Sequence, residues 1–314
     1  MNAPVRLAVI GAGAVGTTIA YTVIMRGIVQ QVVLIDALPQ KAEAEARDLL
    51  HGSMFVPPVE IASGGIEACA GASVVIISSG AKQKAGQTRL QLAEANAAMF
   101  RELIPRVVAA APDAILLVVS NPVDVLTYVA LKISGLPPAR VIGSGTVLDT
   151  SRFRSLLARR LNVAVPNVHA YIVGEHGDSE VPLWSSVHIA SIPLIHFKSP
   201  SAPPLSPEDR EEIFHNVRDA AAQVIAAKGA TNWAIGLAGE RILEAILRDE
   251  DAILTVSSLL TDYRGISGVC ISVPSIVGRA GVTANLPLPF SQAEIDALRH
   301  SSEILRAEIR RLGF

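Results

Sequence analysis

The chain has 314 residues, enough for two domains of ordinary size. Half of its residues are hydrophobic and 18% are charged, which excludes intrinsic disorder because the chain can bury enough apolar surface to offset its folding entropy. The net charge of −2 argues against a nucleic-acid partner or an anionic membrane. Two distant cysteines, Cys69 and Cys270, exclude a disulfide framework and a cysteine zinc site. We expect no metal and a cytoplasmic location.

An uncharged stretch at residues 7–25 has about the length of a membrane span and follows Arg6. Glycines and threonines interrupt its apolar run, and no cleavage site of small residues follows an unbroken apolar core. A signal peptide or membrane span is therefore not expected, and we assign the stretch to the folded domain.

The first half of the chain alternates short apolar runs with segments of helical length and spacing. The predicted strands are at 5–10, 32–35, 74–77 and 115–119, and the predicted helices are at 15–27, 41–51, 88–111 and 123–134. Because these strands are apolar throughout, we expect a parallel sheet covered on both faces, in a Rossmann-type, doubly wound α/β fold. Ligands of such sheets bind beyond the carboxyl ends of the strands.

The second half has a different pattern, which predicts a mixed α+β domain at 144–314 after a first domain at 1–143. Ser206 and Pro207 begin a helix, because serine is a preferred cap and proline is favoured at the first helical position. Ser291 and Glu294 form a capping box that begins the last helix. Strands are expected at 253–256 and 269–273.

A glycine-rich segment, Gly-Ala-Gly-Ala-Val-Gly, lies directly between the first predicted strand and the first predicted helix. In this context the motif predicts a dinucleotide site. Gly11 permits the tight turn, Gly13 lets the backbone approach a pyrophosphate, and Gly16 lets helix and strand pack closely. Ala14 and Val15 begin the helix, where backbone N–H groups are free to bind phosphate.

Asp36 ends the second predicted strand, 20 residues after the last glycine of this motif. A carboxylate at this spacing accepts hydrogen bonds from the ribose hydroxyls and repels a 2′-phosphate, so the sequence favours NAD over NADP. An aspartate that only caps the turn before Pro39 is the alternative.

His176 is the candidate proton carrier. An enzyme that transfers a hydride to or from an oxygen-bearing carbon needs such a group, and histidine suits it because its pKa is near neutrality. Of the seven histidines, only this one has the setting Gly174-Glu175-His176-Gly177-Asp178, directly after an apolar run at 170–173. An ordinary loop histidine is the alternative.

Asp149 and Arg152 lie three residues apart in a predicted helix that continues to residue 161. At about 100° per residue the two side chains share one helix face. An aspartate bound to an imidazole fixes its tautomer, and an arginine binds a substrate carboxylate through two parallel hydrogen bonds. A surface ion pair is the alternative.

The segment 80–89 is polar, is flanked by glycines and leads into a helix. This composition is typical of a lid that closes over a ligand and excludes water. Arg89 at its end would then polarise a carbonyl, although an ordinary solvated loop is the alternative.

These motifs together resemble those of the L-lactate/malate dehydrogenase family, and within it the bacterial L-lactate dehydrogenases. The resemblance covers essentially the whole chain, and its most specific segments are Ser-Asn-Pro-Val-Asp at 120–124, Gly-Ser-Gly-Thr-Val-Leu-Asp at 143–149, Gly-Glu-His-Gly-Asp at 174–178 and Gly-Ala-Thr-Asn-Trp-Ala-Ile-Gly at 229–236. It implies reversible reduction of pyruvate to L-lactate with NADH, in glycolysis and fermentation.

The resemblance also implies a role for each matching position. The implied site comprises His176 as proton donor and acceptor, Asp149 as its partner, Arg152 on the substrate carboxylate, Arg89 on the reacting oxygen, Asn121 at cofactor and substrate, Thr231 in the substrate pocket and Ile235 against the nicotinamide.

Gln83 occupies the family's specificity position, six residues before Arg89. Malate dehydrogenases that resemble this chain have arginine there to neutralise the second carboxylate of oxaloacetate. Because glutamine would leave that carboxylate unpaired in a closed site, pyruvate is favoured. A malate dehydrogenase or a dehydrogenase of bulkier 2-hydroxy acids is the alternative within the class. The adjacent cations Lys82 and Lys84 would weaken the discrimination against oxaloacetate if the lid register differs.

Arg154 and His169 match positions at which many bacterial members bind fructose 1,6-bisphosphate across a subunit interface. The resemblance therefore implies an allosteric homo-oligomer, a tetramer, with this activator as a candidate ligand. An exposed arginine and a structural histidine are the alternative. A non-catalytic NAD-binding protein is the alternative of another class, but such a protein would not need a proton carrier.

Overall fold

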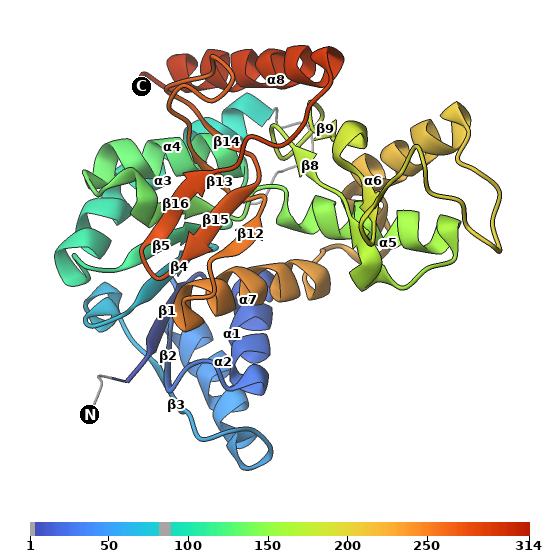
Figure 1. Cartoon of the computed structure of the whole chain (residues 1–314). Coiled ribbons are helices and arrows are strands. Elements are labelled where there is room, and N and C mark those ends of the chain that lie inside the picture. Colours follow the sequence, from blue (N-terminus) through green and yellow to red (C-terminus); the bar gives the residue numbers. More distant parts are fainter. Residues whose placement is uncertain (1–3, 82–88) are drawn as a thin grey trace.

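A computed structural model describes residues 4–81 and 89–314, with only the backbone described for Arg89 and Leu90. It has one large sheet with helices on both faces and a helical extension at one side (Figure 1). The predicted elements of the first half are confirmed to within two residues at their described ends.

The described residues of the first half form six parallel strands and four α-helices. The strands are β1 (Arg6–Ile10), β2 (Gln31–Ile35), β3 (Glu60–Ser63), β4 (Val74–Ile77), β5 (Ile115–Val118) and β6 (Val141–Gly143), and the helices are α1 (Ala14–Arg26), α2 (Pro39–His51), α3 (Arg89–Ala110) and α4 (Val123–Ser134). Their order in the sheet, β3-β2-β1-β4-β5-β6, is that of a Rossmann fold and confirms the doubly wound prediction.

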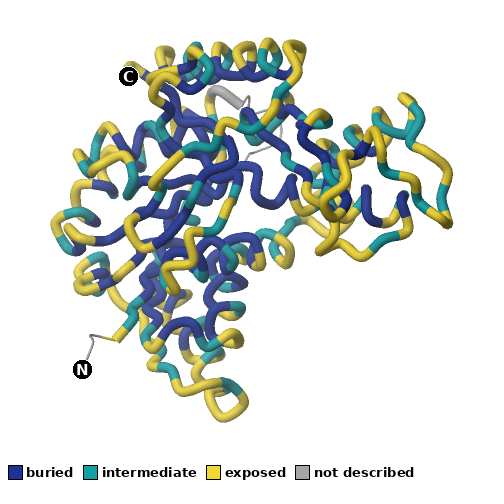
Figure 2. The backbone as a smooth tube through the Cα atoms, viewed as in Figure 1, coloured by how far each residue is buried: buried dark blue, intermediate teal, exposed yellow. Residues whose placement is uncertain are grey.

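Apart from the largely exposed edge strand β3, the strands are buried on both faces because alternate residues enter two separate cores. In β1, for example, Leu7 and Val9 pack with residues of α1, α2 and α7, whereas Ala8 and Ile10 pack with residues of α3, α4 and α8. Figure 2 shows this buried layer running through the sheet between exposed outer helix faces. The apolar excess of the sequence therefore comes largely from the inner strands of a sheet that is covered on both faces.

The second half contains four helices and ten short strands. The helices are α5 (Val147–Leu161), α6 (Pro207–Lys228), α7 (Trp233–Arg248) and α8 (Gln292–Arg311). The strands are β7 (Val168–His169), β8 (Ile172–Val173), β9 (Val181–Pro182), β10 (His188–Ile189), β11 (Ile192–Pro193), β12 (Ala252–Leu254), β13 (Ser257–Leu259), β14 (Cys270–Ser272), β15 (Ser275–Gly278) and β16 (Gly281–Asn285). Both predicted capping motifs are present, at the starts of α6 and α8.

The second half adds two strands to the sheet of the first half. Its strand β13 pairs with β6 in antiparallel orientation, and β14 pairs with β13, so the large sheet has eight strands. Strand β13 was not predicted, because its serines lack the apolar pattern of a buried strand. The antiparallel pair ends the parallel sheet and brings the second half against the carboxyl ends of its strands.

No described helix is both long and apolar enough to cross a membrane. The uncharged stretch at 7–25 instead supplies β1 and most of α1, as expected from its glycines and threonines.

Candidate active site

The glycine-rich loop joins β1 to α1, and its glycines are required by close packing. Gly11 has φ +104°, and a side chain there would lie 2.6 Å from the backbone nitrogen of Ser79. A side chain at Gly16 would overlap the carbonyl oxygen of Gly11. Ser78 braces the turn by donating to that carbonyl at 3.0 Å. The loop is therefore tight because backbone and helix touch without side chains between them.

The start of α1 remains open beside this tight turn. Gly13 is its N-cap, no side chain of the described residues caps the helix, and no acidic residue lies in the first turn. A side chain at Gly13 would meet nothing nearer than the Lys41 ammonium, at 4.0 Å. Free N–H groups and a nearby cation form a site for a phosphate group, and Lys41 is a contributor that the sequence motif did not indicate.

Asp36 lies at the carboxyl end of β2, where it faces the same loop. Its Oδ2 accepts a hydrogen bond of 2.8 Å from the Ala12 N–H, and its Oδ1 accepts one of 3.0 Å from the Leu38 N–H. The carboxylate therefore caps the turn before Pro39, as the alternative predicted. It also links the glycine loop to the start of α2 through these two hydrogen bonds. Its remaining lone pairs are placed to accept ribose hydroxyls. The residues present fit NAD.

His176, Asp149 and Arg152 meet in one hydrogen-bonded cluster. His176 Nδ1 lies 2.6 Å from Asp149 Oδ2, and Arg152 Nη1 donates to Asp149 Oδ1 at 2.6 Å. The Asp149 side chain is only 3% exposed, whereas that of His176 is 25% exposed. One buried carboxylate thus orients both cations, and the imidazole keeps one edge open to a ligand.

Hydrogen bonds between α5 and β8 set the distance between Asp149 and His176. Thr146, at the N-cap of α5, donates to the Ile172 carbonyl at 2.6 Å. Thr150 accepts from the Ile172 N–H at 3.0 Å. Because β8 leads directly into the His176 loop, these contacts hold Asp149 opposite the imidazole.

The His176 loop is also anchored on its other side. Gly174 exchanges two backbone hydrogen bonds with Ser272 of β14, at 2.9 and 3.1 Å. The Glu175 N–H donates to Ser301 Oγ of α8 at 2.8 Å. Gly174 has φ +93°, a conformation that favours glycine, which explains the glycine before the histidine.

The cluster strongly favours a protonated imidazole. Burial opposes the charge on His176, but the Asp149 carboxylate, followed by Asp124 and Glu180, raises the pKa of His176 to about 9. Burial also works against the charge of Asp149, but His176 and Arg152 hold the pKa of Asp149 below its usual range. At neutral pH the pair is therefore an imidazolium and a carboxylate, ready to give a proton.

Glu180 is a buried acid close to this cluster that sequence reasoning missed. It is 6% exposed, and its Oε1 makes no hydrogen bond within the described residues. Burial and the nearby Asp149 charge raise the pKa of Glu180 to about 8, against the effects of His176 and Arg152. The only sign of Glu180 in the sequence is an acidic residue two positions after the segment Gly-Glu-His-Gly-Asp at 174–178.

Asn121 and the base of the predicted lid are joined by a residue that was not predicted. Asn96 of α3 is 1% exposed, donates to the Asn121 carbonyl at 2.8 Å and accepts from the Ala81 N–H at 2.8 Å. Gln83 lies outside the described residues. Arg89 begins α3, but its side chain is not described.

Thr231 and Ile235 flank the start of α7, which packs against α1. Between them, Asn232 donates to Thr18 of α1 at 3.0 Å. This contact places the proposed substrate and nicotinamide residues beside the helix that begins with the glycine loop.

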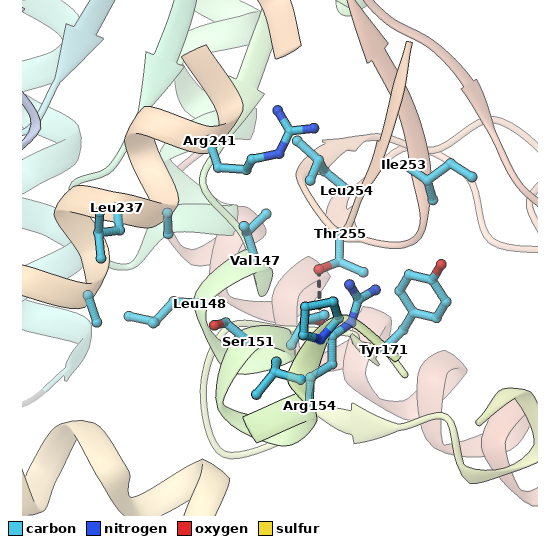
Figure 3. Close-up of a pocket in the computed structure, with 15 residues that line it drawn as sticks. Val147, Leu148, Ser151, Arg154, Tyr171, Leu237, Arg241, Ile253, Leu254 and Thr255 are labelled. Carbon is cyan, nitrogen blue, oxygen red and sulfur yellow. Dashed lines mark hydrogen bonds between the residues drawn. The ribbon is translucent and has the colours of Figure 1, made fainter. Parts of the chain in front are cut away.

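Arg154 lies on α5 and lines a separate cavity of about 430 Å³ between α5, α7 and β12 (Figure 3). Its Nε donates to the Ala170 carbonyl at 2.9 Å, its guanidinium stacks on Tyr171, and burial lowers its pKa. Arg241 approaches the cavity from α7. His169, in β7, is exposed and precedes the Ala170 carbonyl that Arg154 binds.

Two family models match the chain almost end to end. The NAD-binding domain of lactate/malate dehydrogenases matches residues 5–143, and their α/β C-terminal domain matches residues 146–312. An L-lactate dehydrogenase of Bifidobacterium animalis subsp. lactis is 48% identical over 313 residues, which cover 99% of this chain and 98% of the relative.

Two further relatives support the same relationship. An L-lactate dehydrogenase of Thermus aquaticus is 46% identical, covering 98% of this chain and all of the relative. The crystal structure of a minor L-lactate dehydrogenase from Enterococcus mundtii has a TM-score of 0.94 and 40% identity, and the match covers 98% of each chain.

Proposed function

The chain belongs to the lactate/malate dehydrogenase family, and we propose that it is an NAD-dependent L-lactate dehydrogenase, which reversibly reduces pyruvate to L-lactate. The observation that carries the mechanism is the contact of one buried carboxylate, Asp149, with both His176 and Arg152. A proton donor and a carboxylate-binding cation are thereby held a fixed distance apart, as a 2-oxo acid requires.

Each group of the cluster has one task in this proposal. Arg152 binds the substrate carboxylate through its fork of N–H groups. His176 donates its proton to the carbonyl oxygen as that oxygen gains negative charge, and Asp149 stabilises the imidazolium. Arg89 stabilises charge on the same oxygen when the lid is closed, and Thr231 lines the substrate pocket.

The cofactor site follows from the loop geometry. Gly11, Gly13 and Gly16 admit the pyrophosphate, the N–H groups of Ala14 and Val15 bind it, and Asp36 binds the ribose hydroxyls. Asn121 would contact cofactor and substrate, and Ile235 would pack against the nicotinamide. Bound NADH supplies the hydride for reduction. Residues 1–143 are proposed as the cofactor domain and 144–314 as the substrate domain.

Gln83 carries the proposed choice of pyruvate over oxaloacetate. The test is a comparison of kcat/KM for pyruvate, oxaloacetate and longer 2-oxo acids in the wild type and in Gln83→Arg. We expect pyruvate to be preferred strongly by the wild type, and the substitution to raise the efficiency with oxaloacetate, since it neutralises the second carboxylate. Equal or reversed wild-type efficiencies would favour a malate dehydrogenase or another 2-hydroxy-acid dehydrogenase.

Arg154 and His169 support a proposed regulatory site for fructose 1,6-bisphosphate in a cytoplasmic homotetramer. Arg154 binds a carbonyl and an aromatic face, so its charge remains available to a phosphate, and the exposed His169 is close in sequence to that carbonyl. Pyruvate saturation curves with and without the bisphosphate, together with light scattering, test this proposal. Superimposable curves would contradict the regulation, and a monomer in solution would contradict the assembly.

A non-catalytic NAD-binding protein is the alternative of another class. It predicts NADH binding without turnover of any 2-oxo acid. The buried His176–Asp149 pair favours the enzyme, because dinucleotide binding at the glycine loop makes no use of it.

A further inference from the structure

Asp124 lies in the first turn of α4 and takes no direct part in the proposed proton transfer. An acid at this position commonly stabilises the helix N-terminus from the surface. Asp124 is instead only 2% exposed, and its Oδ2 accepts a hydrogen bond of 2.7 Å from the backbone N–H of His176. The carboxylate thus reaches beyond its own helix to the residue that carries the proton.

His176 is therefore held by two carboxylates from different halves of the chain. Asp149 of α5 binds the ring at Nδ1, and Asp124 of α4 binds the backbone at the amide. The first contact fixes the tautomer and the direction of the ring, and the second fixes the Cα from which the ring projects. Proton transfer depends on both, because the donor nitrogen must lie within hydrogen-bond distance of the substrate oxygen.

The groups that face Asp124 come from three other parts of the fold. They are Glu175 and His176 of the loop after β8, Ser257 of β13 and Cys270 of β14. Burial raises the pKa of Asp124 to about 6, while Ser257 and His176 lower it, so the group is ionised above neutral pH. Its Oδ1 makes no hydrogen bond within the described residues.

A neutral asparagine would accept the same backbone hydrogen bond without the cost of a buried charge. The presence of a carboxylate at this buried position therefore points to a contribution from the charge itself. We propose that Asp124 is a positioning residue that holds the His176 backbone and keeps a second negative charge behind the imidazole. The inference rests on the proposed function, since it concerns the proton donor of that reaction.

Asp124→Asn separates these two contributions, because it keeps an acceptor for the His176 N–H and removes the charge. Pyruvate reduction needs protonated His176, so the alkaline limb of kcat/KM should move to lower pH, by about 1 pH unit for the loss of one nearby charge. At pH 6, where His176 is protonated in both proteins, kcat should stay within about threefold of the wild type. Asp124→Ala, which also removes the acceptor, should lower kcat at pH 6 at least ~10-fold through misalignment.

Thr127→Val is the matched control, because Thr127 is also fully buried on α4 and, among the described residues, its hydroxyl bonds only within the helix, to the Val123 carbonyl. Its pH profile should coincide with that of the wild type. A second readout, the pH dependence of inactivation by a histidine-acylating reagent, follows the imidazole without turnover and should show the same shift in Asp124→Asn.

Coincident alkaline limbs for the wild type and Asp124→Asn would overturn the inference. An equal shift of the alkaline limb in Thr127→Val would also overturn it, because the shift would then not be specific to Asp124. Failure of both Asp124 variants to fold would overturn it too, because Asp124 would then have a purely structural role. If the wild type reduces no 2-oxo acid, the proposed function fails, whereas the acylation profiles still decide the role of Asp124.

Discussion

The two parts of the candidate site recognise their ligands by opposite means. The glycine loop presents backbone N–H groups and has no bulky side chains. The charged residues Asp36 and Lys41 lie beside it. The proton-transfer cluster consists of mutually dependent charges, in which the partly exposed His176 and Arg152 share the buried carboxylate of Asp149. Substitutions that add side-chain volume in the loop should therefore change stability or NADH binding. Substitutions that remove a charge from the cluster, and changes in pH, should instead change the rate of pyruvate reduction.

The largest expected effect is that of His176→Asn. Without the proton donor, kcat for pyruvate should fall ~10³–10⁴-fold, as expected for the loss of general acid catalysis. NADH affinity, measured by fluorescence titration, should change little because the glycine loop is untouched. Turnover near the wild-type rate would refute the mechanism, and a parallel loss of NADH binding would refute the separation of the two parts.

Arg152→Lys keeps the positive charge but removes the planar fork. Loss of a charged hydrogen bond costs about 1.5–3 kcal/mol, so kcat/KM for pyruvate should fall ~10–100-fold, mostly through KM. Steady-state kinetics with pyruvate measure this. A lysine variant with unchanged KM would show that Arg152 only supports Asp149 and does not bind the substrate carboxylate.

Gly13→Ala and Gly16→Ala form a matched pair within the loop. A methyl group at Gly16 overlaps the Gly11 carbonyl, so the free energy of unfolding should fall by about 1–3 kcal/mol or more. At Gly13 there is room for the methyl group, so stability should be nearly unchanged while NADH binds ~10-fold more weakly. Urea unfolding and NADH titration of both proteins measure the two effects. If Gly13→Ala bound NADH normally, the pyrophosphate would not lie there.

The smallest expected effect is on stability and comes from Glu180. Its raised pKa means that the folded state holds a proton more tightly than the unfolded chain. The corresponding stability is complete below the usual glutamate pKa and is lost as pH rises through about 8. Glu180→Gln should match the wild type in thermal midpoint at pH 5 and exceed it by a few degrees at pH 9. Parallel curves across this range would contradict the assignment.

Local rules predicted the glycine loop well, because the turn, the helix N-terminus and Asp36 follow one another closely in sequence. Helix geometry predicted that Asp149 and Arg152 share one face, and the family resemblance implied that Asp149 is the partner of His176. The contact itself depends on how α5 packs against β8. Asp124 and Glu180 were missed since nothing local distinguishes a buried acid from a solvated one. The groups around Asp124 come from β13, β14 and the loop after β8, and those around Glu180 come from α5, α6 and the same loop.

The two serine-containing strands that extend the sheet, β13 and β14, have a practical consequence for dividing this protein. A fragment that ends at residue 143 would leave β6 as an uncovered edge, with unpaired backbone groups that invite self-association. It would also lack Cys270 and Ile271, which complete one of its cores. Chimeras that exchange the cofactor-binding half should therefore transplant residues 257–272 with it, because the hydrogen-bonded unit is discontinuous in sequence.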